Sequence, residues 1–564
     1  MKSCFLLTVF LFLKLSINAF SQDLLGHDEA VFARADSLRG TLTSLRACYD
    51  VTFYHLNIKI DPSDKSISGF NTIFFSTVTP FSRMQIDLFP NMKIDSILFE
   101  DGRKCNYERE YGAVFITLPE ELKSGNHSIR VHYNGNPQVA KRPPWDGGFT
   151  WTEDEDGNPW VVVTCQRTGA SLWWPNKDHQ SDEPDSMLMS ITVPPGLEDV
   201  SNGRLRGRRE EVDGWTTFDW FIYSPINNYN VTVNIGKLVH FSDEYVSTNG
   251  EKLTLDYYVL RGNAKKAKKQ FEVVGPMLRT FEHYFGKYPF YRDGFKLIDA
   301  PHNGMEHQTA IAYGNNYLKG YDGYSSSKVG LNFDFIIVHE SAHEWWGNHV
   351  TAKDIADMWI HESFGAYAEA LFVEDNWGYD ASLEYINAKK QNVLNNKPIL
   401  GPFGVNTEGS SDMYDKGQLI LNTLRNVIDN DSLWFSILRG IQETFSHKSV
   451  DGKEIIDYIN ERTGENMDYF FDQYLKFKNL PRFDAIISAK GDRVTLRYRW
   501  KADVDFRMPL KVTISTGRYE FIRPTMEWQE MELNDIDAGD FRIAEDHFYC
   551  DKKISRIYTD PDSP

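Results

Sequence analysis

The sequence predicts a multidomain α+β protein with three parts: an N-terminal β domain built as a sandwich or saddle, a mainly helical middle domain, and a small C-terminal β-sandwich. Apolar and polar residues alternate with a period of two from about residue 49 to residue 239. The period becomes helical near Ala264 and returns to two after Pro481. The expected boundaries are residues 1–21 for a signal peptide, then 22–240, 241–480 and 481–564 for the three domains.

The N-terminal β domain rests on short alternating runs separated by turn residues. Leu56–Ile60 places apolar and polar residues in turn, as a half-buried strand does. Similar runs are Val51–Phe53, Thr72–Ser76, Ala113–Leu118, Ser128–Tyr133, Trp160–Thr164 and Tyr229–Ile235. An acidic loop at residues 153–157 could hold calcium, but its irregular carboxylate spacing favours a solvated loop.

The middle domain shows helical spacing of its apolar residues. In Ala264–Phe285, one face carries Phe271, Val274, Leu278 and Phe281, and the helix is expected to end before Gly286. Further expected helical segments are Phe333–Gly347, Met358–Val373, Lys416–Ile428, Ser449–Thr463 and Met467–Leu475. In the C-terminal β domain, the residues expected to face one way are Val494, Leu496, Tyr498 and Trp500, and then Leu510, Val512 and Ile514.

The first 21 residues have the pattern of a secretory signal. A positive residue, Lys2, precedes the apolar stretch Phe5–Leu13, and Ala19–Ser21 forms a small-x-small cleavage site. A stretch of nine residues is too short to span about 30 Å of hydrocarbon, and no later segment is long and apolar enough to do so. We therefore expect an exported protein, periplasmic or secreted, without stable membrane insertion.

The charge balance excludes a class of partner. Without the signal segment, the chain has 59 basic and 80 acidic residues, which gives a net charge of −21. Such an excess repels nucleic acid and anionic lipid. Four scattered cysteines, Cys48, Cys105, Cys165 and Cys550, do not make a disulfide-built fold, although one or two bridges remain open in an oxidising compartment.

The most informative motif is His-Glu-x-x-His at residues 339–343, followed by Glu362 nineteen positions after His343. Residues four apart lie one turn above each other on a helix, so His339 and His343 can converge on one ion. Two imidazoles and a carboxylate are the ligand set of a catalytic zinc, with a fourth position open for water. Glu340 projects about 100° around the helix from His339, where it can take a proton from that water. A chance match on a solvated helix is the alternative, but the apolar run Phe335–Val338 leads into the motif, and buried histidines need partners.

This segment closely resembles the aminopeptidase N family of zinc metallopeptidases, which includes the hydrolase acting on the leukotriene epoxide. The family has Trp-x-Gly-Asn after the second histidine, matched here by residues 345–348, and a glutamate after eighteen residues, matched by Glu362. The family usually has Asn and Gly where this chain has His361 and Ser363. The resemblance implies a thermolysin-like, mainly helical catalytic domain with one Zn²⁺ per chain, bound by His339, His343 and Glu362.

A second signature precedes the zinc motif. Family members carry Gly-x-Met-Glu-Asn, and this chain has Gly304, Met305 and Glu306 between Asn303 and His307. The resemblance implies that Glu306 binds the free α-ammonium of a peptide and that the flanking backbone pairs with it as an extra strand. A carboxylate in a partly dry cleft gains charge-assisted hydrogen bonds from an ammonium, which a mid-chain peptide does not offer. An ordinary surface acid is the alternative for Glu306 taken alone.

Two further residues are implied in the same way. Gln166, ahead of Asp182-Glu183-Pro184, resembles the N-domain residue that shares the ammonium, with a strand-end glutamine as the alternative. Tyr414, in Tyr-Asp-Lys-Gly, resembles the tyrosine whose hydroxyl donates to the oxyanion, which can contribute roughly 3 kcal/mol, and a packing tyrosine is its alternative.

The function expected is removal of single residues from peptides with a free N-terminus, with Glu340 as the base. The rivals are a zinc endopeptidase, which would use the same metal chemistry, a weaker epoxide hydrolase, and a peptide-binding module on a degenerate enzyme scaffold. The long C-terminal helical domain of typical members is expected to be absent, which predicts a more open cleft. The preferred first residue and the oligomeric state are not revealed by the sequence.

Overall fold

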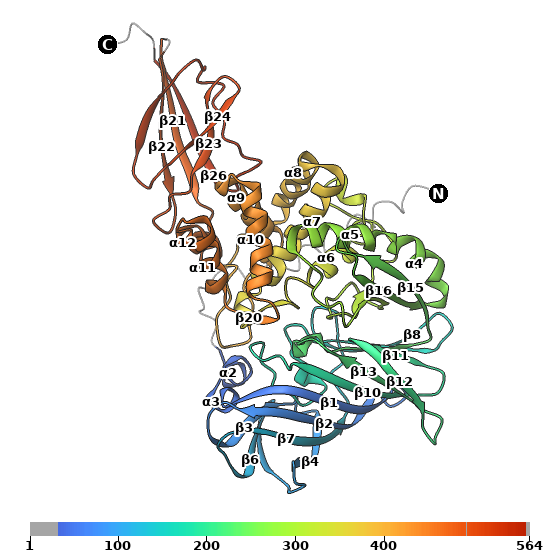
Figure 1. The fold of residues 1–564 in the computed structure, drawn as a ribbon. Coiled ribbons are helices and arrows are strands. Elements are labelled where there is room, and N and C mark those ends of the chain that lie inside the picture. Colours follow the sequence, from blue (N-terminus) through green and yellow to red (C-terminus); the bar gives the residue numbers. More distant parts are fainter. Residues whose placement is uncertain (1–31, 492, 560–564) are drawn as a thin grey trace, which may run out of the picture.

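The computed structural model describes residues 32–491 and 493–559, so the expected signal peptide lies outside the described residues. Figure 1 shows a β-rich N-terminal part, a mainly helical middle and a separate set of C-terminal strands, arranged in chain order along the molecule. Within the described ranges no helix has the length and apolar character needed to cross a membrane. The four cysteines Cys48, Cys105, Cys165 and Cys550 are free thiols.

The N-terminal part begins with two short helices and is dominated by a seven-stranded sheet in the order β12-β13-β10-β1-β2-β7-β4. The expected alternation is seen in β1, where Leu56, Ile58 and Ile60 are buried. Strand β1 pairs antiparallel with β2 and parallel with β10. The elements are α2 (Arg34–Gly40), α3 (Ser44–Ala47), β1 (Tyr49–Asp61), β2 (Ser66–Thr77), β4 (Met92–Phe99), β7 (Asn126–Gly135), β10 (Ser186–Val193), β12 (Arg204–Glu210) and β13 (Thr216–Ile222).

Two smaller sheets complete this part, one in the order β3-β6-β5 and one in the order β11-β14-β9-β8. The second sheet matters for the site, because β9 ends at Thr164 and Gln166 follows two residues later. The strands are β3 (Phe81–Asp87), β5 (Asn106–Glu110), β6 (Ala113–Leu122), β8 (Gly148–Glu153), β9 (Pro159–Thr164), β11 (Glu198–Ser201) and β14 (Val233–Gly236).

The middle part contains a four-stranded sheet, β15-β16-β17-β18, that the helical periodicity did not predict. Its inner strand β17 is buried at all five positions, so it has no alternation to detect. The strands are β15 (Leu238–Val246), β16 (Lys252–Leu260), β17 (Phe295–Asp299) and β18 (Ile311–Tyr313). A two-stranded sheet pairs β19 (Val350–Ala352) with β20 (Lys448–Val450).

The prediction of one continuous helix over residues 264–285 was wrong, because a 3₁₀ turn at Phe271–Val273 divides it. Pro276 lacks an N–H, and its ring would meet the carbonyl of Glu272 in a continuous helix. The helix does end before Gly286. The helices are α4 (Ala264–Gln270), α5 (Val274–Phe285), α6 (Phe335–Ala342), α7 (Trp359–Trp377), α8 (Tyr379–Ala388), α9 (Asp415–Ile428), α10 (Asp431–Thr444), α11 (Gly452–Thr463) and α12 (Asp468–Lys476).

The C-terminal strands form a four-stranded sheet, β25-β22-β21-β26, and a hairpin of β23 and β24. All four alternating residues of β22 are buried, as expected. In β23, however, Thr513 is buried and Ile514 only half-buried, because the pairing register shifts between Thr513 and Ser515. The strands are β21 (Arg482–Lys490), β22 (Arg493–Lys501), β23 (Leu510–Ser515), β24 (Arg518–Ile522), β25 (Gln529–Leu533) and β26 (Asp551–Thr559).

The buried apolar side chains form two cores. One core holds the N-terminal strands together with a few residues of the middle part, including Met305. The other runs without interruption through the helices and the C-terminal strands. The cleft described below lies where the two cores meet, because its residues come from both parts of the chain.

Candidate metal centre and its cleft

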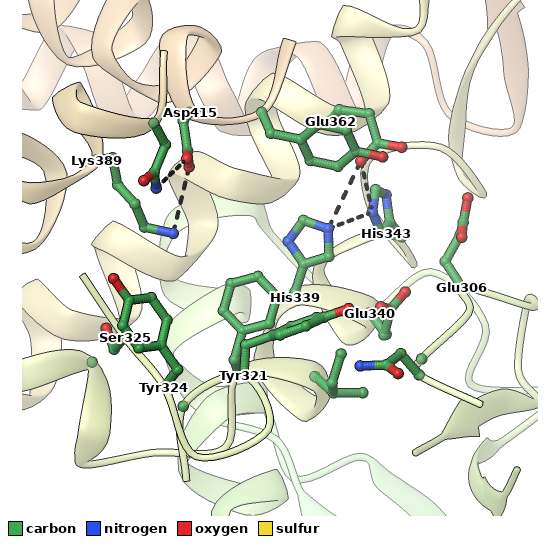
Figure 2. A pocket seen from close by; sticks show the side chains of 18 of the residues that line it. Glu306, Tyr321, Tyr324, Ser325, His339, Glu340, His343, Glu362, Lys389 and Asp415 are labelled. Atoms are coloured by element: carbon green, nitrogen blue, oxygen red, sulfur yellow. Dashed lines mark hydrogen bonds and ion pairs between the residues drawn. The ribbon is translucent and has the colours of Figure 1, made fainter. Parts of the chain in front are cut away.

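Helices α6 and α7 bring three potential metal ligands together (Figure 2). The Asp334 side chain caps α6 by accepting from the Ile337 N–H at 3.3 Å, and the helix then carries His339 one turn before His343. The two histidine Nε2 atoms lie 3.3 Å apart, and Oε2 of Glu362 in α7 lies 3.4 Å from Nε2 of His343. All three side chains are buried.

The hydrogen bonds on the far side of each imidazole decide what this cluster can hold. His339 Nδ1 lies 2.6 Å from Glu369 Oε1, and His343 Nδ1 lies 2.9 Å from the Trp346 carbonyl. A carbonyl only accepts, so the neutral His343 ring carries its proton on Nδ1, and the Glu369 carboxylate favours the same tautomer in His339. Both Nε2 lone pairs then point at each other and at Oε2 of Glu362, which has no hydrogen-bond partner within the described chain. Three converging acceptors with no proton between them fit a divalent cation, and two nitrogens with one carboxylate are zinc ligands.

The pKa shifts of His343 and Glu362 also indicate that this cluster favours positive charge. Burial acts to lower the pKa of His343, yet the Glu362 carboxylate outweighs it and raises that pKa to about 9. Burial acts to raise the pKa of Glu362, but the two histidines hold it well below its usual range. A cation held between the three groups would supply the positive charge that these shifts favour.

Glu340 lies in α6 directly beside the cluster, with its side chain in the same cleft. Burial raises the pKa of this carboxyl to about 7. A group with a pKa near neutrality is suited to accept a proton and return it. Gly304 packs against it so closely that a Cβ there would lie 2.6 Å from Glu340 Oε1 and 2.5 Å from Ile336 Cγ2. The glycine is needed for this close approach of backbone to side chain.

Glu306 lines the same cleft, near His343 and Glu340 (Figure 2). Its Oε1 accepts from Gln166 Nε2 at 2.6 Å and from the Tyr229 hydroxyl at 3.2 Å. Gln166 also reaches Glu362 Oε1 at 3.3 Å, which links this carboxylate to the metal cluster. Burial raises the pKa of Glu306, with His343 opposing and Glu362 adding to the rise. A buried carboxylate with only neutral hydrogen-bond donors is suited to receive a cation.

The backbone around Glu306 is held from both sides. Met305 exchanges two hydrogen bonds with Ala312, which extends the edge at β18, at 3.2 and 3.0 Å. The Glu306 carbonyl accepts from Asn348 Nδ2 at 3.0 Å, and Asn348 follows the second histidine closely in the chain. The structure therefore brings Gln166, Gly304, Met305 and Glu306 into one cleft with the three metal-ligand candidates.

Tyr414 enters the same cleft from the residue that caps the N-terminus of α9. Its ring centre lies 6.0 Å from that of His339. Burial raises the pKa of its hydroxyl well above the usual range, as does Glu362, while the Arg167 guanidinium opposes the rise. The hydroxyl therefore keeps its proton and can donate a hydrogen bond.

Residues 269–474 match the family model described as the peptidase family M1 domain. The chain carries an M1 peptidase domain. This domain contains every site residue named above except three from the N-terminal part, Gln166, Arg167 and Tyr229.

Relatives with curated names include the leucyl aminopeptidase of Saccharolobus solfataricus, 23% identical over 476 residues, which covers 78% of this chain and 57% of that protein. Human endoplasmic reticulum aminopeptidase 1 is 25% identical over 360 residues, covering 61% of this chain and 37% of that protein. The chain thus spans a little more than half the length of the first of these relatives and about a third of the length of the second. In fold, an M1 zinc metallopeptidase of Deinococcus radiodurans bound to a Tyr-Ser-Ala substrate matches with a TM-score of 0.67 at 21% identity, covering 79% of this chain and 98% of that one.

The M1 domain contains a residue that the sequence interpretation missed. Glu369 binds His339 Nδ1 through one oxygen and accepts from the Tyr385 hydroxyl at 2.5 Å through the other. Glu369 lies seven residues after Glu362 in α7, which is two helical turns along the same face. That spacing was a usable signal, because metal-bound histidines commonly donate their other N–H to a carboxylate. Tyr229 carried no such signal, since it is 77 residues from its partner Glu306.

The two residues of α7 that depart from the family pattern do not line the cleft. His361 Nε2 accepts from the Ala352 N–H at 2.8 Å, which ties α7 to β19. The Ser363 hydroxyl donates to the Met413 carbonyl at 2.7 Å, just before Tyr414, and a Cβ on Gly417 would lie 2.2 Å from Ser363 Oγ. Both residues act as packing contacts behind the site. They leave the orientation of Glu362 toward the two histidines intact.

The cleft itself has a volume of about 340 Å³. Asn303 lies at its edge and donates to Asp322 Oδ2 at 2.9 Å. His307 is buried outside the cleft, and burial lowers the pKa of its ring to about 3. The cleft therefore presents carboxylates, two imidazoles and a tyrosine hydroxyl to whatever enters it.

Proposed function

We propose that the protein is a zinc-dependent aminopeptidase that removes the N-terminal residue from peptides. The observation that carries the proposal is the buried Glu306 carboxylate, which shares the cleft with the His339, His343 and Glu362 cluster and has only neutral donors as partners. An α-ammonium satisfies that carboxylate, and a mid-chain peptide group does not. The names of the relatives, which are aminopeptidases, support the same activity.

A bound zinc ion would supply Lewis acidity, lowering the pKa of water and polarising a carbonyl. Side chains of this protein bind the substrate, transfer the proton and stabilise the developing negative charge. Glu306 and Gln166 fix the substrate N-terminus, so that the first peptide bond would lie beside a metal held by His339, His343 and Glu362. Glu340 takes a proton from the attacking water and returns it to the departing amine. The Tyr414 hydroxyl donates to the oxygen on which negative charge develops.

We also propose export to the periplasm or the medium, based on the signal pattern in residues 1–21. In such a compartment, the net negative charge of the protein leaves peptides as more plausible partners than nucleic acids.

The experiment that tests the activity compares a tripeptide with its N-acetylated form, with and without a chelator. We expect the free peptide to be hydrolysed at its first bond. The acetylated peptide should be hydrolysed at least about 100-fold more slowly, because the acetyl group removes the charge that Glu306 binds. Chelation should abolish activity, and added zinc should restore it.

The variant Glu306→Gln sharpens this test. It should lower kcat/KM for the free tripeptide about 100-fold and leave the slow rate on the acetylated peptide unchanged. Equal digestion of free and acetylated peptides by the unaltered protein would instead identify an endopeptidase, and no zinc-dependent hydrolysis of either would identify a binding protein.

A further inference from the structure

The charged side chains along the cleft are unevenly placed. Glu306, Glu340, Glu362 and Asp415 all line it, but within the described part of the chain Lys389 is the only lysine or arginine that does so. Figure 2 shows Lys389 on the opposite side of the metal-ligand cluster from Glu306. The cleft thus has a carboxylate for a positive group at one end and an ammonium at the other.

Local structure explains how Lys389 reaches the cleft. After α8 ends at Ala388, the chain forms a 3₁₀ turn over Lys389–Asn392. Residues three apart in a 3₁₀ helix lie on the same face, so Lys389 and Asn392 both line the cleft. The Lys389 Nζ lies over the rings of Phe335 and Tyr385, 5.4 and 5.1 Å from their centres, which fixes the long side chain by cation–π contacts.

The ammonium of Lys389 forms two ion pairs, but its N–H groups make no short hydrogen bond in the described part of the chain. Its two ion pairs are long, 3.4 Å to Asp415 Oδ1 and 3.9 Å to Glu369 Oε2, and neither has hydrogen-bond geometry. Asp415 does not depend on this lysine, since its carboxylate accepts from Asn392 Nδ2 at 2.8 Å and from Gln418 Nε2 at 3.3 Å. An ammonium has three N–H donors, so Lys389 can accept a further anionic partner without breaking a short bond.

We propose that Lys389 binds the C-terminal carboxylate of short peptides, so that the protein acts preferentially on dipeptides and tripeptides. This inference rests on the proposed aminopeptidase function. A peptide held at Glu306 by its ammonium runs past the metal ligands toward Lys389. An extended chain advances about 3.3–3.6 Å per residue, so a carboxylate one or two residues beyond the first peptide bond lies about 4–7 Å past it. Lys389 Nζ lies 3.9 Å from Glu369 Oε2, and the other oxygen of Glu369 binds His339 Nδ1, so Lys389 lies close to the metal-ligand cluster.

The test is a comparison of trialanine with trialanine amide, which differ only in the terminal charge. For the zinc-loaded full-length protein we expect kcat/KM to be at least about tenfold higher for the free acid, because a charge-assisted contact is lost in the amide. In Lys389→Met the value for the free acid should fall to that of the amide, so the ratio approaches one. In Lys389→Arg the preference should be retained.

Lys389 also touches Glu369, so a merely structural role must be separated from a binding role. A structural role would lower the rates on both substrates by the same factor and leave their ratio unchanged, and that result would overturn the inference. The matched control is Lys390→Met, since Lys390 donates to the Glu545 carbonyl outside the cleft, and it should keep the ratio of the unaltered protein.

A length series from dialanine to pentaalanine gives an independent measurement. We expect kcat/KM to fall between tripeptide and pentapeptide in the unaltered protein and to become flat in Lys389→Met. Equal rates on acid and amide by an unaltered protein that does hydrolyse them would reject the role of Lys389 alone. Absence of hydrolysis of any free-amine substrate would reject the aminopeptidase function instead.

Discussion

The two ends of the cleft are built in different ways. At the metal end, His339, Glu362 and Glu369 come from α6 and α7 and His343 caps the end of α6, so the four lie within about 30 residues of chain. At the ammonium end, Glu306 meets Gln166 and Tyr229, which are 140 and 77 residues away in the sequence. The metal end is therefore local in the sequence, and the ammonium end exists only when the N-terminal part packs against the segment around Glu306.

This difference separates two kinds of function. Groups that bind metal and move protons need tight mutual geometry, which adjacent turns of packed helices provide. Groups that choose the substrate terminus can be divided between the N-terminal strands and the M1 domain. Changes at the metal end should thus act on turnover and metal content, whereas changes at the ammonium end should act on kcat/KM for substrates with a free amine.

The largest effect is expected for Glu340→Gln at the metal end. Gln cannot accept the proton from water, so kcat should fall by about 10²- to 10⁴-fold. Zinc content should stay at one ion per chain, because Glu340 is not one of the converging ligands. Steady-state kinetics and metal analysis of the same preparation measure both quantities. A variant with near-normal turnover would show that another group is the base.

Glu369→Gln should weaken zinc binding by about 10- to 100-fold, because the neutral amide no longer polarises His339. Competition with a chromogenic chelator measures the affinity. Glu374→Gln in the same helix is the matched control: it removes a carboxylate that pairs with Arg425 at 2.6 Å, away from the cleft. That control should change the melting temperature and leave zinc affinity unaltered, and equal affinity losses in the two variants would argue against a specific role of Glu369.

The smallest effect is expected for Tyr229→Phe at the ammonium end. Loss of one hydrogen bond to Glu306 should lower kcat/KM for free peptides about 3- to 10-fold and leave zinc affinity unchanged. The Tyr229 hydroxyl acts to lower the pKa of Glu306, so the variant raises that pKa further. Since only the ionised carboxylate binds an ammonium, the acid limb of the kcat/KM profile should move to higher pH. An unshifted limb would mean that Tyr229 only packs there.

The same contrast explains what could be predicted from the sequence. The β-rich N-terminal part, the helical middle and the C-terminal strands follow from the hydrophobic period, and the four-residue spacing of His339 and His343 puts them on one helical face. Glu306, Gln166 and Tyr414 were assigned through family resemblance, and the structure brings them to one cleft. Strand β17 was missed because a fully buried strand has no period, and Tyr229 because long-range contacts leave no local pattern.

The continuous core through the helices and the C-terminal strands has a consequence for Tyr414. Helix α9 begins at this tyrosine, and further along it Thr423 Oγ1 accepts from the Tyr549 N–H at 2.9 Å. The Tyr549 carbonyl in turn accepts from the Tyr474 hydroxyl of α12. The segment just before β26 thus supports the helix that presents a proton donor to the cleft, and none of the described cleft-lining residues comes from the C-terminal strands.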